Sequence, residues 1–275
     1  MRKILILVFV IVFMFAGCSQ SGVNTDNNTD TDSESVFSED NYKEPVSFPV
    51  LMYHTSSEED PAVENADGRI VDPDLFIKPS EFDRQIKYLI DNNYNFCIFD
   101  DWYSLYNIEN PVFITFDDGY IENYTEIFPV LQKYQKDGYD VKITIFLVTE
   151  PAKKEILTPE IIREMSDSVL VKFESHTVTH ANLAEISGDS ERLERELRDS
   201  KSKIERQTGR TVHAISYPGG GYNQTVTEKA GEFYQFGIST DWGFHRTDIS
   251  DFKIRRLAVG RNASIEDFAR LLRKE

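Results

Sequence analysis

Short apolar runs alternate with longer amphipathic stretches from about residue 45 to the end of the chain. The runs have the length and composition of buried strands, and the stretches between them carry apolar residues at helical spacing. The expected strands cover residues 50–53, 111–116, 141–147, 169–173, 212–217, 235–240 and 255–259. Helical connections imply parallel pairing with right-handed crossovers. The pattern predicts an α/β fold, a distorted (β/α) barrel of about seven parallel strands, with an open doubly wound sheet as the alternative.

Capping residues mark where helices are expected to begin and end. The expected helices begin near Ser80, Tyr124, Thr158, Ser190 and Ser264. Thr158 is followed by Pro159, and Pro is favoured at the first helical position. Ser264 precedes Asp267 by three positions, which is typical of a capped N-terminus. The longest helix is expected to run to about residue 206, because Gly209 follows it.

The first 18 residues have the pattern of a signal peptide. Arg2 and Lys3 precede an apolar run over residues 4–15, which is short for a membrane-spanning helix. Residues 15–18, Phe-Ala-Gly-Cys, resemble a bacterial lipobox with Phe in place of the usual Leu. This resemblance implies that Cys18 carries a lipid; an uncleaved membrane anchor is the alternative. Both interpretations predict an exported protein held at the cell membrane and facing outward.

The segment 19–44 has a different composition from the rest of the chain. It is rich in Asn, Thr, Asp and Ser and contains few large apolar residues. Such a segment buries too little surface to offset the entropy of ordering it. We therefore expect a disordered acidic tether over residues 19–44, between the signal peptide at 1–18 and one globular domain at 45–275.

Charge and cysteine content narrow the range of partners. The formal net charge is −17, which argues against a nucleic acid partner, because phosphate binding needs a basic patch. It also argues against electrostatic docking on anionic lipid. Cys97 lies in an apolar run and is expected to be a small buried hydrophobe. We expect a monomer.

Chemically active side chains follow two of the predicted strands. Asp117-Asp118-Gly119 ends the run at residues 111–116, and His176 and His180 follow the run at 169–173. A turn would also use Asp and Gly, but strand C-termini are where α/β folds place catalytic groups. In a parallel barrel these ends share one rim. One carboxylate and two imidazoles there would form a three-ligand metal site with an open position, which leaves the second carboxylate free as a base.

Three motifs, in order, resemble the polysaccharide deacetylases (carbohydrate esterase family 4, the Nod-factor deacetylase homology domain). They are Thr115-Phe116-Asp117-Asp118-Gly119, His176-Thr177-x-x-His180 and Tyr217-Pro218-x-Gly220. The resemblance covers about residue 45 to the C-terminus. Residues 50–54, Val-Leu-Met-Tyr-His, are similar to the start of a bacterial subgroup that includes poly-N-acetylglucosamine deacetylases.

The resemblance implies a role for each motif. Asp117 would be the general base, and Asp118, His176 and His180 would hold a divalent metal, most often zinc, with cobalt, nickel or manganese as alternatives. The metal would activate water and polarise the acetyl carbonyl.

The third motif would serve the substrate. The loop of Tyr217, Pro218 and Gly219 would supply a backbone N–H near Gly219 to the developing oxyanion. Trp242 would form a wall of the sugar pocket, and a core position is its alternative.

The chain departs from the family pattern at the residues that orient the base and donate the proton. Ser216 stands where many members have the arginine that orients the base. Arg256 could replace it, although a surface or structural role is favoured. The last strand lacks the histidine that serves many members as the acid. His54, at the end of the first strand, would be its neighbour in a closed barrel and becomes the candidate acid, with a structural histidine as the alternative. His245 is expected in a surface loop.

The most specific hypothesis is a metal-dependent hydrolase. It would remove N-acetyl groups from an N-acetylglucosamine-containing polymer at the cell surface, either an exopolysaccharide or peptidoglycan. The alternatives are an O-acetyl esterase of the xylan type and an inactive glycan-binding lipoprotein. The sequence leaves open whether residues 55–78 form a lid.

Overall fold

The computed structural model describes residues 44–60, 72–152 and 156–273. The signal peptide, Cys18 and the tether lie outside the described residues, so the boundaries proposed for them stay predictions. Within the described ranges, no helix combines the length and the apolar composition needed to cross a membrane.

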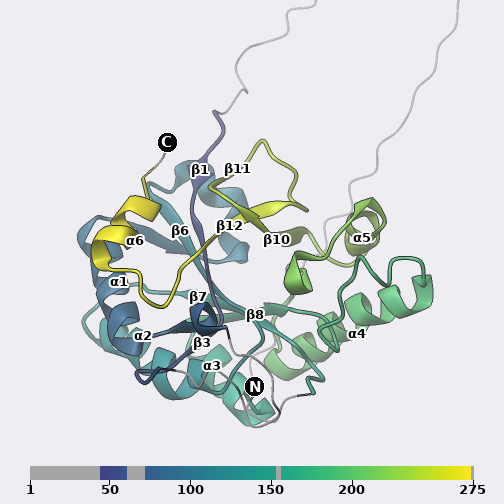
Figure 1. Ribbon diagram of the computed structural model, residues 1–275, viewed down its shortest axis with the longest axis horizontal. Helices are drawn as coiled ribbons and strands as arrows, with labels where there is room; N and C mark the ends of the chain where they lie inside the picture. The colour runs from purple at the N-terminus through teal and green to yellow at the C-terminus, as the bar shows by residue number, and fades with distance from the viewer. Residues whose placement is uncertain (1–43, 61–71, 153–155, 274–275) are drawn as a thin grey trace, which may run out of the picture. The chain divides into compact units, whose positions relative to one another are not determined.

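Seven parallel strands form a closed barrel, which confirms the predicted fold class (Figure 1). Their order is β2-β12-β10-β9-β8-β7-β6, and β6 pairs back to β2 to close the ring. The strands are β2 (Val50–Tyr53), β6 (Pro111–Phe116), β7 (Ile143–Leu147), β8 (Val171–Ser175), β9 (Ala214–Ser216), β10 (Phe236–Trp242) and β12 (Ile254–Ala258). Because every strand runs in the same direction, all their C-terminal ends meet at one rim.

Helices surround the barrel, as Figure 1 shows for α6, α1, α2, α3 and α4. They are α1 (Pro79–Asp91), α2 (Phe128–Lys136), α3 (Pro159–Asp167), α4 (Ser190–Thr208), α5 (Gln224–Ala230) and α6 (Ile265–Leu271). Thr158 and Ser264 cap α3 and α6 as predicted, and Gly209 ends α4 with φ 68°. Helix α1 begins one residue earlier than expected, at Pro79, and α5 was not predicted.

The strand residues alternate between two buried layers. The outward-facing side chains, such as Leu51 and Ile114, join the helices in the larger apolar cluster. Inward-facing residues such as Val50 and Phe113 form a second cluster with the 3-10 segment η3 (Phe99–Asn107). This second cluster fills the N-terminal part of the barrel, so the opposite rim is left for polar side chains.

Short elements extend the barrel at its edges. Strand β5 (Asn95–Cys97) pairs with the first half of β6, and Cys97 is buried as predicted. Above the rim, β3 (Thr55–Ser56) pairs with β4 (Phe76–Ile77), which follows η2 (Pro73–Leu75). The short 3-10 turn η5 (Pro218–Gly220) follows β9.

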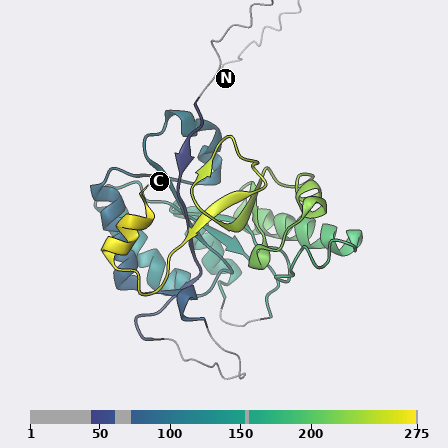
Figure 2. The same ribbon diagram turned by 45° about the horizontal axis from the view of Figure 1, so that its top comes forward.

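The expectation for His245 was wrong. It is fully buried in β11 (His245–Arg246), which pairs antiparallel with β1 (Ser47–Phe48) (Figure 2). Its ring lies 5.6 Å from the rings of both Phe48 and Trp102. The local sequence has the composition of a loop, but β1, almost 200 residues away in the sequence, packs over His245 and buries it.

Helix α2 also differs from its prediction. A π-helical turn, η4 (Asn123–Ile127), replaces the start of the continuous helix expected from Tyr124. Pro129 lies at the beginning of α2 and cannot donate a backbone N–H to the carbonyl four residues before it. The wider π register accommodates this missing bond, and such turns are frequent at functional sites.

Candidate active site

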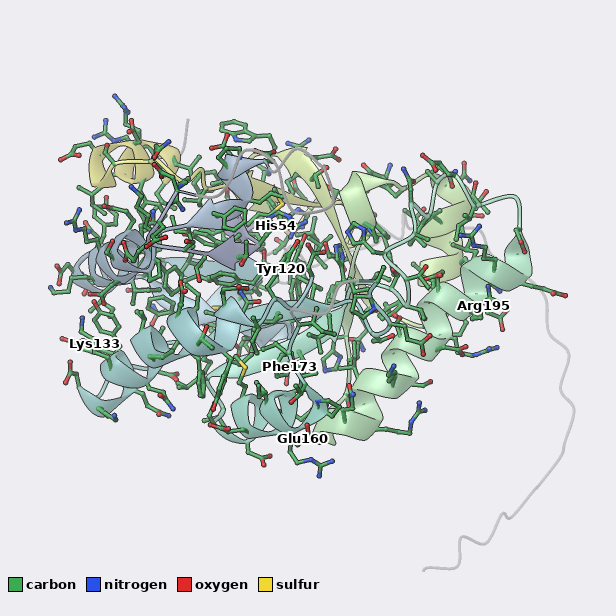
Figure 3. All side chains as sticks on the ribbon, turned by 60° about the horizontal axis from the view of Figure 1, so that its bottom comes forward. His54, Tyr120, Lys133, Glu160, Phe173 and Arg195 are labelled. Atoms are coloured by element: carbon green, nitrogen blue, oxygen red, sulfur yellow. The ribbon has the colours of Figure 1, made fainter. Side chains whose placement is uncertain are left out.

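The predicted catalytic groups gather where the strands end. Asp117 and Asp118 follow β6, His176 follows β8, and His54 follows β2. In Figure 3, His54 and Tyr120 lie in the middle of the molecule, whereas Lys133, Glu160 and Arg195 belong to the surrounding helices. The barrel therefore brings together side chains that are more than 100 residues apart in the sequence.

Asp118, His176 and His180 form a cluster with the geometry of a metal site. One ligand atom from each lies within 4.8 Å of the others. Nε2 of His176 is 3.6 Å and Nε2 of His180 is 3.4 Å from Asp118 Oδ1. Two ligands bound at about 2.0–2.1 Å to one tetrahedral zinc ion would be about 3.3–3.4 Å apart. The three residues therefore fit a divalent ion with little movement.

The orientation of His176 is suited to a ligand. Its Nδ1 lies 2.8 Å from the carbonyl oxygen of Ser216. A carbonyl can only accept, so Nδ1 carries the proton and Nε2 keeps its lone pair towards Asp118. Burial lowers the pKa of His176 despite the nearby carboxylates of Asp117 and Asp118, so the ring is neutral, which is the form that binds metals.

Tyr120 is a contact of the cluster that the sequence did not predict. Its hydroxyl forms a hydrogen bond with Asp118, and burial together with this carboxylate raises the pKa of Tyr120 well above its ordinary value. A protonated hydroxyl in this place donates to Asp118 and helps to fix its orientation. The only signal in the sequence was its position directly after the Asp-Asp-Gly motif.

Asp117 is a buried carboxylate held by a buried arginine. Nη1 and Nη2 of Arg256 donate to its two oxygens, each at 2.8 Å. Nη2 also donates to Ser216 Oγ at 3.1 Å, and Ser216 Oγ donates to Asp117 at 3.3 Å. Burial would raise the pKa of Asp117, but the charge of Arg256 outweighs it and holds the pKa well below its usual range. The carboxylate is therefore ionised.

Arg256 does not lie on the surface, which was one of the two roles favoured for it from sequence. Its side chain is 1% exposed and makes a two-pronged contact with Asp117. Its Nε also donates to the carbonyl of Ser239 at 2.9 Å, which fixes the plane of the guanidinium. Arg256 thus contacts Asp117 from β12, while Ser216 contacts the same carboxylate from β9. The alternation of β12 places Arg256 inside the barrel and Arg255 outside.

His54 reaches the same site from β2. Tyr53 pairs with Phe116, so His54 and Asp117 follow neighbouring positions on adjacent strands. The carboxylates of Asp117 and Asp118 and the guanidinium of Arg256 act on the His54 ring. Burial lowers its pKa although the two carboxylates oppose the shift. The imidazole is therefore neutral at neutral pH. Its backbone carbonyl accepts a hydrogen bond from Asn123 Nδ2 at 3.0 Å.

The third motif forms the loop at the end of β9. Tyr217 is fully buried and donates its hydroxyl proton to the carbonyl of Phe252, so it can meet a substrate only through its backbone. Pro218 is buried beneath the turn, and Gly219 is exposed with φ 59°. The first N–H groups of a helical turn have no partner within it, which leaves the Gly219 N–H free of the turn's own bonds.

The position of Trp242 excludes the core alternative. Its side chain is 65% exposed at the end of β10, opposite Arg256 in the strand register. The wall of a sugar pocket stays a prediction. The neighbouring Asp241 accepts a hydrogen bond from the hydroxyl of Tyr222 at 2.7 Å, so this part of the rim is polar.

Strained backbone accompanies the cluster. Asp118, Thr177 and His180 have φ of 73°, 71° and 62°, although none is glycine. Such residues are uncommon and concentrate at functional sites. Gly119 has φ 79°, and a Cβ there would meet Leu147 Cδ2 at 2.5 Å, which explains why the motif requires glycine.

Comparison with known proteins agrees with this geometry. The family profile described as polysaccharide deacetylase matches residues 106–234. YxkH of Bacillus subtilis (strain 168), assigned by its name to the polysaccharide deacetylases, is 30% identical over 226 residues, which cover 79% of this chain and 73% of YxkH.

Two solved structures are also similar. BC0361, a polysaccharide deacetylase from Bacillus cereus, is 32% identical with a TM-score of 0.74, over 83% of this chain and 70% of that one. The deacetylase PplD of Streptococcus pyogenes, solved with acetate, is 27% identical with a TM-score of 0.72, over 84% of this chain and 100% of that one.

The fold, the site and these relatives define a hydrolase that acts on N-acetyl groups. The chain belongs to the polysaccharide deacetylase family. A polysaccharide is therefore its substrate class, and the Asp-His-His cluster is its possible metal site.

Proposed function

We propose that the protein is a metal-dependent N-deacetylase of an N-acetylglucosamine-containing polysaccharide at the cell surface. The observation that carries the proposal is an ionised, arginine-held Asp117 directly beside the Asp118, His176 and His180 cluster. A base and a three-ligand site in contact are what hydrolysis by activated water requires. Adjacent carboxylates on one strand do not suit a glycoside hydrolase, whose two carboxylates act on a glycosidic bond from separate positions.

The donor set favours zinc. One carboxylate and two imidazoles leave a fourth position open, as in catalytic zinc sites, and cobalt, nickel or manganese would fit the same ligands. When bound, the ion would activate a water molecule and polarise the acetyl carbonyl. Asp118, His176 and His180 would hold it.

The remaining steps fall to this chain's own residues. Asp117 takes the proton from the attacking water, and Arg256 keeps its oxygens aligned. The Gly219 N–H, next to Pro218, donates to the oxyanion that forms on the acetyl carbon. Trp242 and the backbone at Tyr217 border the sugar.

His54 is the proposed proton donor to the leaving amine. It is neutral at rest, so it must gain a proton during the reaction before it can pass one on. Its position next to Asp117 provides a short route for that proton. Amine departure without a proton is unfavourable, so a group in this place is needed.

The proposals for the particular polymer and for the subgroup depend on a short segment of the chain. The motif over residues 50–54 is similar to that of the poly-N-acetylglucosamine deacetylase subgroup, and it supplies His54. We therefore favour an exopolysaccharide or peptidoglycan as the polymer. An O-acetyl esterase of the xylan type is the second candidate, because activated water serves both reactions.

Acetate release from a panel of glycans tests the function. Poly-N-acetylglucosamine, chitin oligomers, peptidoglycan and acetylated xylan would be compared with zinc present and with a chelator added. We expect release from the N-acetylated polymers, loss of release with chelator, and loss in Asp117→Asn, which keeps the shape of the side chain. Release only from xylan would favour the esterase. Equal, negligible release by wild type and variant, with glycan binding kept, would establish an inactive binding protein.

We further propose that the protein is a monomer anchored outside the cell membrane. Residues 1–18 would be the signal peptide, Cys18 the lipidated residue, and residues 19–44 the tether of a catalytic domain at 45–275. Cys18→Ser should move the protein from the membrane to the soluble fraction and abolish incorporation of a labelled fatty acid. A Cys97→Ser variant is the matched control, because Cys97 is buried in the domain. Unchanged membrane association of Cys18→Ser would contradict the lipid anchor.

A further inference from the structure

Glu196 is a buried carboxylate that contacts the loop between the two histidines. It lies on the inner face of α4, next to the apolar Leu197, and is 2% exposed. We propose that Glu196 is a positioning residue that holds His176 and His180 in the geometry of a metal site. The inference rests on the proposed metal-dependent function and adds a residue from outside its motifs.

Three hydrogen bonds join this carboxylate to the loop. Oε2 accepts the backbone N–H groups of Val178 at 2.8 Å and Thr179 at 2.9 Å, and Oε1 accepts the hydroxyl of Thr179 at 2.6 Å. The two backbone donors belong to the residues directly between the ligands. Hydrogen bonds to an ionised carboxylate are short and about twice as strong as neutral ones. One side chain therefore satisfies both backbone N–H groups in the middle of the ligand loop.

The burial of this charge is not explained by an ion pair. No arginine, lysine or histidine in the described part of the chain forms a salt bridge with Glu196, whereas Glu194 on the same helix pairs with Arg198 and Lys229. A buried carboxylate without a cation is costly unless hydrogen bonds satisfy it. The loop donors supply those bonds, so the position of Glu196 and the shape of the loop depend on each other.

The loop needs such a restraint. Thr177 and His180 both have positive φ, and strained residues persist only where the surroundings hold them in place. Other bonds hold the ends of the loop and its carbonyls: the N–H of His176 donates to Leu147 O, and the N–H of His180 donates to Thr177 Oγ1. The carbonyls of Thr177 and Val178 accept the N–H groups of Thr149 and Glu150, whereas the N–H groups of Val178 and Thr179 have Glu196 as their acceptor. Without Glu196, the middle of the loop could relax and separate the two Nε2 atoms.

Metal affinity separates positioning from general stability. The full chain would be compared as wild type, Glu196→Ala, Glu196→Gln and the control Glu191→Gln, an exposed acid on the same helix. The probes are zinc affinity by chelator competition and the visible absorption spectrum of bound cobalt. Circular dichroism and thermal unfolding, both in chelator, report on the metal-free fold.

We expect Glu196→Ala to weaken zinc affinity by about 10–100-fold, as is usual when an outer partner of metal ligands is lost. Its cobalt spectrum should change, because the ligand geometry changes. Glu196→Gln should recover most of the affinity, since an amide oxygen still accepts both backbone N–H groups. Glu191→Gln should match wild type.

A second variant tests the contact from the other side. Thr179→Val removes the shortest of the three bonds from an exposed residue and leaves α4 intact. Thr179→Val should also weaken zinc affinity, by a smaller factor than Glu196→Ala. This variant still tests the positioning role if Glu196→Ala does not fold. Wild-type affinity and cobalt spectrum in a folded Glu196→Ala, or in Thr179→Val when Glu196→Ala does not fold, would overturn the positioning role. A wild type that binds no metal would instead overturn the proposed function on which the role rests.

Discussion

Asp117 owes its position to side chains on two other strands. Arg256 comes from β12 and Ser216 from β9, and both bind its oxygens inside the barrel. Arg256 is in turn held by the carbonyl of Ser239 on β10. A buried ion pair of this kind has little value for stability compared with apolar residues, but it fixes geometry and charge. Its presence at the rim is best explained by the chemistry of Asp117.

Replacing Arg256 by lysine tests this explanation. Arg256→Lys keeps the charge but loses the two-pronged contact. We expect kcat for acetate release to fall about 100-fold, because a small displacement of a catalytic group has effects of this size, while KM changes little. Steady-state kinetics measure both values. Arg255→Lys, on the exposed face of the same strand, is the matched control. Unchanged kcat in Arg256→Lys would show that the arginine has only a structural role.

His245 gives the stability of the domain a pH dependence. Both of its ring nitrogens lack a hydrogen-bond partner within the described residues, and burial lowers the pKa of His245 to about 4, with Arg255 adding to the shift and Asp248 opposing it. Between pH 4 and pH 6.5, the ordinary pKa of histidine, the His245 side chain is protonated in the unfolded chain and neutral in the folded chain. Stability contributed by this residue is therefore present above pH 6.5 and is lost as the pH falls towards 4.

Denaturant unfolding at several pH values measures this dependence. The free energy of unfolding of wild type should fall by an extra amount, on the order of 3 kcal/mol at most, between pH 6.5 and 4 relative to His245→Phe. The phenylalanine ring keeps an aromatic contact with Phe48 and Trp102 and removes the titrating group. Equal pH slopes in the two proteins would contradict the assignment to His245.

Among the secondary-structure elements, those with strong local signals agree with expectation. The capped helices α3, α4 and α6 have the ends that Thr158, Gly209 and Ser264 predict. One element that deviates lies next to the site. The π turn η4 connects the Asp-Asp-Gly loop to α2, and its Asn123 is fully buried. Asn123 joins that loop to β2, because it bonds the carbonyls of both Tyr120 and His54.

Asn123→Ala should therefore loosen the connection between β2 and the loop after β6. The His54 carbonyl would lose its side-chain donor, and the expected loss in the free energy of unfolding is about 1–3 kcal/mol. Urea unfolding measures it. Asn223→Ala, which removes a cap from α5 away from His54, is the control for catalysis: it should lower stability by about 1 kcal/mol but keep kcat. A fully stable, fully active Asn123→Ala would contradict the role of the π turn.

For the domain as a whole, the proposed metal would join distant parts of the chain. Asp118 follows β6, and His176 and His180 follow β8, so one ion would connect the loops of two strands on either side of β7. A ligand that binds only the folded state stabilises it by mass action. Metal content and global stability should therefore be coupled.

Thermal unfolding with zinc and with chelator measures this coupling. Zinc at about 100 times its dissociation constant should add about 2.7 kcal/mol to the free energy of unfolding of wild type. The increase should vanish in His180→Ala, whose half-exposed side chain can be removed with little effect on the core. An equal zinc effect in wild type and variant would place the binding elsewhere.

Local patterns in the chain were sufficient for the class of fold and for most of its elements. Apolar runs separated by amphipathic stretches predicted the parallel barrel, because burial on both faces and helical crossovers leave a periodic record in neighbouring residues. The motif residues Asp117, Asp118, His176 and His180 were found for a related reason. They lie at the end of a strand or in the loop that follows it, and parallel strands bring such ends to one rim.

Contacts between distant strands leave no comparable pattern in the local sequence. Arg256 reaches Asp117 across 139 positions, and nothing near it distinguishes it from a surface arginine. The sequence around His245 predicted a loop, because the strand that covers it, β1, is distant in the sequence. Glu196 is one of many acidic residues on a charged helix. Closure of the barrel and the free-energy cost of burying an unpaired charge determine which residues make such contacts. Both depend on the whole fold, and neither can be read from neighbours in the sequence.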